Sequence, residues 1–399
     1  MKIRSAFFVF MLMAASCGLS EIDGGNPQEG GGIWGGPIAG PGDSVADQIC
    51  YMTVVDYAKG YDWRSDMASE SVRCSLVVYV DGSAVMKVPV GQSRQVSSDA
   101  DMHRVVGGNL YTDYSEDSRT IVKKNSQYLF SYEGAERVCN LIVSGEDVYT
   151  LGESRLGTGF SFRRNGEPVL TRTNGYLTAP LRHDGDSLCF GFCEQIRSAE
   201  GPVDRYYCVY GSKVTNLSLR EDLKAVWDVF TSSGEPVCLV LLHGLSQPVI
   251  IHGENMLALN IPKGLTMISG SMFCAGDRIG VEGVCRTATG GLKSGIWVDG
   301  KQQVLFDNAN ISAVFADGGG ICCVLNPMNS ASEGMIYRCG EIFKMPKGYS
   351  CVGVNGLSMI NGILHVGLSS LAGERPIVWK DGQLDTLSVN GYISSITAR

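Results

Sequence analysis

Long apolar segments and helical patterns are scarce in this chain of 399 residues. Beyond the first 16 residues, no apolar run approaches the roughly 18 residues that a membrane-spanning helix needs. No stretch combines helix-period apolar residues with a cap over more than a turn or two, and we interpret the nearest candidate, residues 219–229, as a connector. These absences exclude a helical bundle and favour a fold built from strands.

Signatures of catalysis and metal binding are also missing. The five histidines are His103, His183, His243, His252 and His365. None falls in an H-E-x-x-H pattern or at the close spacing of paired metal ligands. No G-x-S-x-G elbow, phosphate-binding glycine loop or sialidase-type aspartate box occurs. We therefore predict neither a metal ion nor another cofactor, and we expect His365, on an apolar strand, to be a core residue.

Positive charge is limited and scattered. The chain has 33 Lys and Arg against 41 Asp and Glu, and its formal net charge is −8. Proteins that bind nucleic acid depend on grouped Lys and Arg, which displace counterions from the phosphates. No such basic cluster is present, so we predict that the chain does not bind nucleic acid.

The 14 cysteines do not form a recognisable disulfide framework. With Cys17 set aside their number is odd, and most lie within apolar strand-like runs, as small core residues do. Cys189 and Cys193 are four residues apart on one strand, about 13 Å at roughly 3.3 Å per residue, which is too far to bridge. We predict free structural thiols, with one or two cross-strand bridges or metal ligation as alternatives.

The first residues have the order of a secretory signal: Lys2 and Arg4, an apolar run over residues 6–15, then Ser16 and Cys17. Residues 13–17 resemble the bacterial lipobox, although Ala14 and Ser16 replace commoner residues. This resemblance implies that residues 1–16 are a signal peptide and that Cys17 is lipidated. The alternative is an ordinary cleaved signal followed by a chance Cys.

Residues 17–47 are rich in Gly and Pro and have no apolar periodicity. Such a segment cannot bury enough surface to order itself, so we predict a flexible tether. By the same resemblance, Gly18 after the Cys implies sorting to the outer membrane of the cell envelope, on either its periplasmic or its surface face. We expect a monomer whose membrane contact is the N-terminal lipid.

A strand that ends in Asp-Gly or a close relative recurs along the rest of the chain. The clearest copies are residues 296–300 and 378–382. Weaker copies end at Gly82, Gly134, Gly166, Gly211, Gly253 and Gly340. A residue that accepts positive φ between two alternating apolar runs predicts a hairpin. Eight such hairpins, about one propeller blade apart, indicate a repeat architecture.

A second set of tight turns lies between the first. These turns are at residues 108–109, 145–146, 185–186, 234–235, 276–277, 319–320 and 361–362. Together the two sets predict units of four antiparallel strands, a to d, in about 43 residues, which is the size of one propeller blade. Residues 48–399 are therefore predicted to form an all-β, eight-bladed β-propeller. Seven blades are the alternative, because the turns at Gly134 and Gly166 are unusually close.

Eight c–d turns against seven a–b turns predict how the ring closes. Residues 49–57 and 74–80 follow the tether and correspond to strands b and c, whereas residues 391–399 follow a strand d and correspond to a strand a. We expect the C-terminal strand to complete the blade that the N-terminus begins, which removes an exposed strand edge.

The b–c loops of a propeller lie on one face, and here they are expected to be long and varied. Loops on a rigid scaffold often carry binding residues, although many are polar only because water surrounds them. The candidate ligand-binding residues are Tyr61, Trp63, Arg64, Glu116, Asp117, Arg119, Arg197, Arg286, Asn326 and Glu374. Trp63 is the preferred anchor, because an aromatic ring in a polar loop is costly to leave exposed.

The lipobox, the glycine-rich tether and the Trp-Lys/Val-Asp-Gly hairpins together resemble exported lipoproteins of gut-dwelling anaerobic bacteria. The blades of those proteins carry a Trp-Lys-Asn/Asp-Gly repeat. The resemblance covers residues 295–399 well and residues 72–294 loosely, and it implies the fold more than an activity. We expect a non-catalytic envelope lipoprotein that binds a glycan, peptide or protein on the b–c face. The alternative is a glycan-active hydrolase or lyase that uses loop carboxylates.

Overall fold

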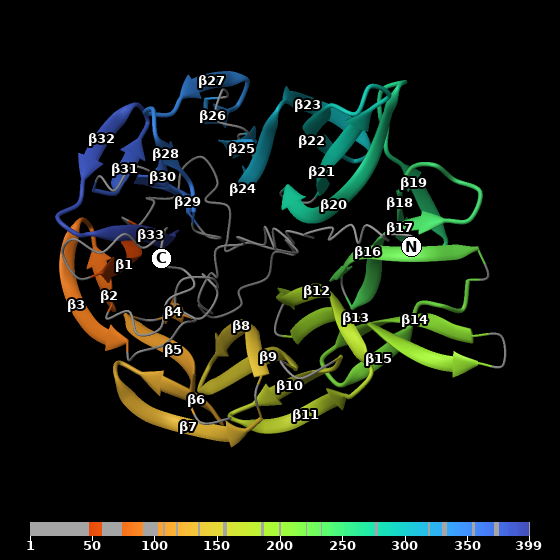
Figure 1. The fold of residues 1–399 in the computed structure, drawn as a ribbon, viewed down its shortest axis with the longest axis horizontal. Helices are drawn as coiled ribbons and strands as arrows, with labels where there is room; N and C mark the ends of the chain where they lie inside the picture. The colour runs from red at the N-terminus through yellow and green to blue at the C-terminus, as the bar shows by residue number, and fades with distance from the viewer. Residues whose placement is uncertain are drawn as a thin grey trace, which may run out of the picture.

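The computed structural model describes residues 48–57, 74–90, 103–106, 108–116, 119–134, 136–154, 158–184, 187–198, 201–220, 222–232, 234–275, 278–317, 320–328, 333–352, 356–370 and 375–398. Within these ranges all regular elements are β-strands. None of the described segments is a helix long and apolar enough to cross a membrane. The strands form eight antiparallel sheets arranged around a common axis, an eight-bladed β-propeller (Figure 1).

In order from the axis outward, blade 1 contains β33 (Gly391–Ala398), β1 (Cys50–Tyr57), β2 (Cys74–Val80) and β3 (Ser83–Val90). Blade 2 contains β4 (His103–Val106), β5 (Asn109–Glu116), β6 (Arg119–Lys124) and β7 (Gln127–Glu133). Blade 3 contains β8 (Glu136–Ser144), β9 (Asp147–Ser154), β10 (Phe160–Arg164) and β11 (Glu167–Arg172). Blade 4 contains β12 (Gly175–Asp184), β13 (Ser187–Ser198), β14 (Gly201–Tyr210) and β15 (Lys213–Asn216).

Blade 5 contains β16 (Leu223–Ser232), β17 (Glu235–Leu242), β18 (Val249–His252) and β19 (Asn255–Ala258). Blade 6 contains β20 (Leu265–Ala275), β21 (Arg278–Thr287), β22 (Leu292–Val298) and β23 (Lys301–Asp307). Blade 7 contains β24 (Ala309–Asp317), β25 (Gly320–Pro327), β26 (Met335–Arg338) and β27 (Glu341–Lys344). Blade 8 contains β28 (Tyr349–Ser350) and β29 (Leu357–Ile360), which both pair with β30 (Ile363–Ser370), then β31 (Ile377–Lys380) and β32 (Gln383–Thr386).

The eight-blade prediction is confirmed, and the seven-blade alternative is wrong because β8 to β11 form a complete blade. One turn was placed incorrectly: Gly134 follows strand d of blade 2 rather than preceding it. The c–d turn of that blade is Asn125-Ser126, where both residues adopt positive φ, 51° and 73°. The predicted turns at Gly134 and Gly166 were unusually close in sequence because Gly134 was taken for a turn that contains no glycine.

The Asp or Asn of the repeated hairpin has a second role besides accepting positive φ. In blades 1, 2, 3, 6 and 8 its side-chain oxygen accepts a hydrogen bond from a backbone N–H of strand b in the same blade. The acceptors are Asp81, Asn125, Asn165, Asp299 and Asp381, with N···O distances of 2.8 to 3.2 Å. The turn residue therefore ties strands b, c and d together, which glycine alone cannot do.

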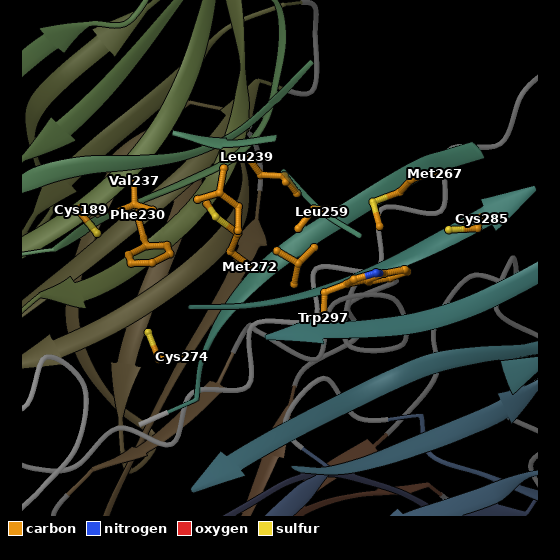
Figure 2. Close-up of a cluster of buried hydrophobic side chains, with 12 residues drawn as sticks. Cys189, Phe230, Val237, Leu239, Leu259, Met267, Met272, Cys274, Cys285 and Trp297 are labelled. Carbon is orange, nitrogen blue, oxygen red and sulfur yellow. The ribbon is translucent and has the colours of Figure 1, made fainter. Parts of the chain in front are cut away.

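The tryptophans of the two clearest repeats fill seams between blades. Trp297 is fully buried in an apolar cluster between blades 5 and 6, beside Leu259 and Met267 (Figure 2). Its indole N–H donates a hydrogen bond to the backbone oxygen of Asn260, at 3.1 Å. Trp379 packs against Phe343 of blade 7, with 5.3 Å between ring centroids. Each Trp thus contacts the preceding blade, which explains its place in the repeat.

The predicted ring closure is confirmed, with β33 lying beside β1 (Figure 1). The two strands pair antiparallel from Cys50 opposite Ala398 to Asp56 opposite Gly391. A Cβ atom on Gly391 would lie 1.8 Å from the backbone oxygen of Val55, so only glycine fits where the closing strand begins. The first and last described segments therefore belong to one blade.

The outer strands are protected from edge pairing in two ways. The four longer ones, β3, β7, β11 and β23, each contain a β-bulge opposite strand c. The other four, β15, β19, β27 and β32, have only four residues each. Bulges and short lengths both prevent an edge strand from pairing with another chain. The eight outer edges therefore offer little length of regular strand to another chain.

Two further expectations about strands need correction. Residues 219–229 are a connector only as far as residue 222, since β16 begins at Leu223 and supplies strand a of blade 5. The b–c loops are not uniformly long, because residues 117–118 and 199–200 are two-residue connections. In blade 4, strands β13 and β14 extend further at their b–c end and take the place of a long loop.

The cysteines behave as core residues. The thirteen in the described part of the chain form no disulfide, and ten of them are buried. His365 is also buried, as predicted, and its Nδ1 lies 3.0 Å from the backbone oxygen of Ile363. Burial lowers the pKa of this imidazole, which makes a neutral core histidine.

Candidate functional site

Several predicted site residues lie outside the described part of the chain. They are Cys17, Tyr61, Trp63, Arg64, Asp117 and Glu374. Glu116 is the last residue of β5, and its backbone is opposite Arg119 across the two-residue b–c connection of blade 2. The predictions for these seven residues therefore remain predictions.

Two of the described candidates are already engaged within the protein. Arg119 forms an ion pair with Glu133, with 3.0 Å between Nε and Oε1, and both side chains are exposed. The Asn326 amide donates to the backbone oxygen of Cys351 at 2.6 Å and accepts from its N–H at 2.9 Å. Asn326 thus joins blade 7 to the first residues of blade 8, a structural role.

Arg197 and Arg286 are exposed at the b–c ends of β13 and β21. Among the described residues, neither guanidinium has an ion-pair partner within 4 Å. They belong to different blades, as do Arg119 and Asn326. The structure therefore places the described candidates around the b–c face instead of gathering them in one pocket.

Blade 4 carries an extended hairpin on this face. Strand β13 pairs with β12 only as far as Glu194, whereas its pairing with β14 continues to Ser198 opposite Gly201. The end of this hairpin is a two-stranded ribbon, and Val203, opposite Ile196, has 46% of its surface exposed. Pro202 on one edge has no N–H to offer a further strand. The ribbon, with Arg197 on it, is thus an exposed element on a rigid base.

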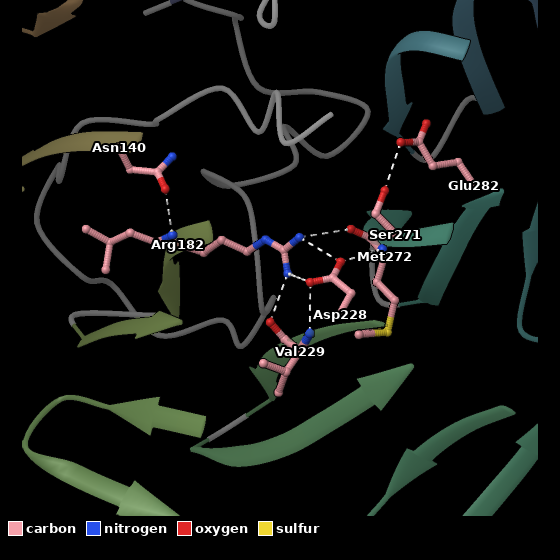
Figure 3. A network of polar contacts seen from close by, with 8 residues as sticks. Asn140, Arg182, Asp228, Val229, Ser271, Met272 and Glu282 are labelled. Carbon is pink, nitrogen blue, oxygen red and sulfur yellow. Dashed lines mark hydrogen bonds and ion pairs between the residues drawn. The ribbon is translucent and has the colours of Figure 1, made fainter. Parts of the chain in front are cut away.

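A buried charge cluster lies between blades 4, 5 and 6, and the sequence analysis missed it (Figure 3). Arg182 on β12 and Asp228 on β16 are 5% and 2% exposed. Their side chains form two parallel contacts of 3.1 and 2.9 Å. The guanidinium also donates to the backbone oxygens of Val229 and Met272, at 3.0 and 3.4 Å. The ion pair therefore reaches the innermost strands of three successive blades.

The Asp228 carboxylate has further partners. It accepts hydrogen bonds from the backbone N–H groups of Val229 and Met272, at 2.8 and 2.7 Å. Together with the two contacts from Arg182, the carboxylate therefore has four hydrogen-bond donors in the interior. The signal in the sequence was a charged residue within an apolar inner strand, but alternation alone does not show which charges meet.

Glu282 on β21 lies in the same region and is 8% exposed. Ser271 donates a hydrogen bond to its Oε1 at 2.9 Å. Its Oε2 is buried without a hydrogen-bond partner among the described residues. Burial raises the pKa of this carboxyl to about 8, so Glu282 is mostly protonated at neutral pH.

A recess of about 220 Å³ opens between blades 4 and 5. Its apolar lining is Leu217, Leu219, Leu223, Val226, Pro236, Cys238, Val240 and Ile251. It exists because β15 ends at Asn216 and leaves the seam uncovered. Burial raises the pKa of the Cys238 thiol well above its usual range, so this cysteine is not a nucleophile.

Arg182 and Asp228 are buried and bind each other and nearby backbone groups, so neither side chain is exposed to a substrate. Within the described ranges, no group of three His, Cys, Asp or Glu side chains is placed to hold a metal ion.

The chain matches no protein-family model and no curated protein. Among solved structures it is similar to the β-propeller domain of the Trilobed protease from Pyrococcus furiosus, with 9% identity, a TM-score of 0.44 and coverage of 76% of this chain and 95% of that one. It is also similar to the Pyrococcus horikoshii acylaminoacyl peptidase, with 11% sequence identity and a TM-score of 0.45. This match covers 82% of this chain and 55% of the peptidase. TolB from Acinetobacter baumannii has 11% identity and a TM-score of 0.30, covering 87% and 82%. At such identities the likeness concerns the fold alone.

Proposed function

We propose that the protein is a lipoprotein of the cell envelope whose propeller is a non-catalytic binding scaffold. It is held in the outer membrane through lipid on Cys17 and binds a glycan, peptide or protein partner on the b–c face. The observation that carries this proposal is the exposed ribbon of blade 4, with Arg197, on an otherwise rigid ring. The interior charges, in contrast, are used to join the blades.

The contacts of Gln48, the first residue that the structure describes, support this arrangement. Gln48 precedes strand b of blade 1, on the face of the a–b and c–d turns. Its side-chain and backbone groups form three hydrogen bonds with Asn361, a turn residue of blade 8, at 2.8 to 3.1 Å. A tether that ends at this turn face leaves the opposite b–c face free for a partner.

Replacing Cys17 with Ser should move the protein from the membrane fraction to the soluble fraction, because a Ser cannot accept the lipid. Cell fractionation with immunoblotting measures this. The matched control is Cys50→Ser, which removes a different thiol and should leave the distribution unchanged. A Cys17→Ser protein that remains with the membranes would show that the anchor is elsewhere.

Replacing Trp63 with Ala should weaken binding by roughly 2 kcal/mol, about 30-fold, since buried aromatic anchors dominate binding energies. Binding is measured on a glycan array and by pull-down from envelope extracts, followed by titration of the captured ligand. The melting temperature should hardly change. Tyr128→Ala removes an aromatic side chain that is 64% exposed near a c–d turn, and it serves as the control.

A drop of several degrees in the melting temperature with unchanged binding would make Trp63 a packing residue. Conversion of an arrayed glycan into smaller products would favour the hydrolase or lyase alternative over a binding scaffold.

A further inference from the structure

The seam between blades 6 and 7 contains a carboxyl group in apolar surroundings. Glu282 is opposite Ser271 on β20 and Ile296 on β22, so these three side chains share one face of blade 6. Ile296 belongs to an apolar cluster that includes Cys323 and Leu325 of blade 7. Glu282 therefore lies on the face of blade 6 that packs against blade 7.

The charged and titratable groups around Glu282 do not compensate for its burial. Asp228 of blade 5 disfavours a second negative charge, and Arg182 of blade 4 favours it but is held by Asp228. Ser271 supplies one hydrogen bond, and from blade 7 the Cys323 thiol, whose pKa is raised by burial and by Glu282, supplies no positive charge. The proton on Glu282 is thus the main means of keeping this seam uncharged.

We propose that Glu282 makes the seam between blades 6 and 7 a pH-sensitive latch, closed while its carboxyl is protonated and loosened as rising pH favours ionisation of the carboxyl. On ionisation the proton leaves to water and the negative charge needs hydration. Since Oε2 is buried without a hydrogen-bond partner among the described residues, separation of β21 and β25 would give it the water that its charge needs. The opened seam exposes the apolar faces of β24 and β25.

The direction of the pH dependence follows from linkage. An opened seam lets Glu282 ionise near its ordinary value of 4.5, whereas the closed seam keeps the proton up to about pH 8. Between these values the open state binds fewer protons than the closed state, so raising the pH favours opening. The effect is complete above about pH 8, because the closed state then ionises as well.

Amide hydrogen exchange tests the latch on the full domain. Peptides that cover β24 (Ala309–Asp317) and β25 (Gly320–Pro327) are followed from pH 6 to pH 9, with each rate divided by the intrinsic rate at that pH. We expect the protection of these amides to fall about tenfold for each pH unit between pH 6 and pH 8 and then level off. Peptides that cover β33 should keep their protection, because this strand pairs with β1 of blade 1 and not with the strand that carries Glu282.

Glu282→Gln is the matched variant, because it keeps the acceptor for Ser271 and cannot ionise. Its β24 and β25 amides should show no fall with pH. If this variant does not fold, Glu282→Met keeps the apolar seam and makes the same prediction. A wild-type response that persists in Glu282→Gln, or a parallel loss of protection in β33, would overturn the latch, the latter because it would indicate global unfolding.

Discussion

A protein that lacks residues 391–399 is expected to aggregate instead of forming a soluble domain with slightly lower stability. These residues contain β33, the innermost strand of blade 1, which pairs along the whole of β1. Ile393 and Ile396 on this strand are almost completely buried, against Val54 and Val77 among others. Without β33 the ring has an unpaired strand edge next to exposed apolar surface, a combination that promotes association between chains.

Size-exclusion chromatography and calorimetry measure this effect. A truncation that removes only Arg399 is the matched control, since β33 ends at Ala398 and remains intact. A synthetic peptide of residues 391–399, added during refolding, should restore part of the soluble protein if the missing strand is the cause. A soluble, cooperatively melting product of the long truncation would contradict the role of β33 in closing the ring.

The fold could be predicted because each repeat has local turn chemistry that a single sequence shows. Positive φ favours Gly, Asn or Asp between two apolar runs, and seven of the eight c–d turns contain Gly. The exception, Asn125-Ser126, has the same backbone conformation without glycine, and for that reason Gly134 was mistaken for the turn. Closure by the two ends followed from the number of turns, which stayed correct because the turn of blade 2 was misplaced but not missed.

The candidate site was less predictable, for a physical reason. Strand alternation assigns a residue to one face of a blade, but it does not say what the neighbouring blade presents there. Asn326 was selected as an exposed loop residue, although its amide binds the backbone of Cys351 across a seam. Arg182 and Asp228 are 46 residues apart and became neighbours only because successive blades stack. Contacts between blades need the three-dimensional arrangement.

The buried pair offers the second large effect. Replacing Arg182 with Met should lower the free energy of unfolding by about 3–5 kcal/mol, because it leaves the Asp228 carboxylate buried without its cation. Asp228→Leu should cost at least as much, because it also leaves the N–H groups of Val229 and Met272 without their acceptor. Urea or thermal unfolding of the two single variants and the double variant gives the coupling energy between the side chains.

An exposed pair of the same chemistry provides the control for this cycle. Arg220 and Asp222 make two contacts of 3.0 Å, yet their side chains are 41% and 48% exposed. Water screens this pair, so its coupling energy should be much smaller than that of the buried pair. The buried pair should show a coupling of several kcal/mol, and the double variant should recover only part of the loss, since the four backbone groups around it stay unpaired. Equal couplings for the two pairs would mean that the charge cluster does not join blades 4, 5 and 6, and that apolar packing alone holds these seams.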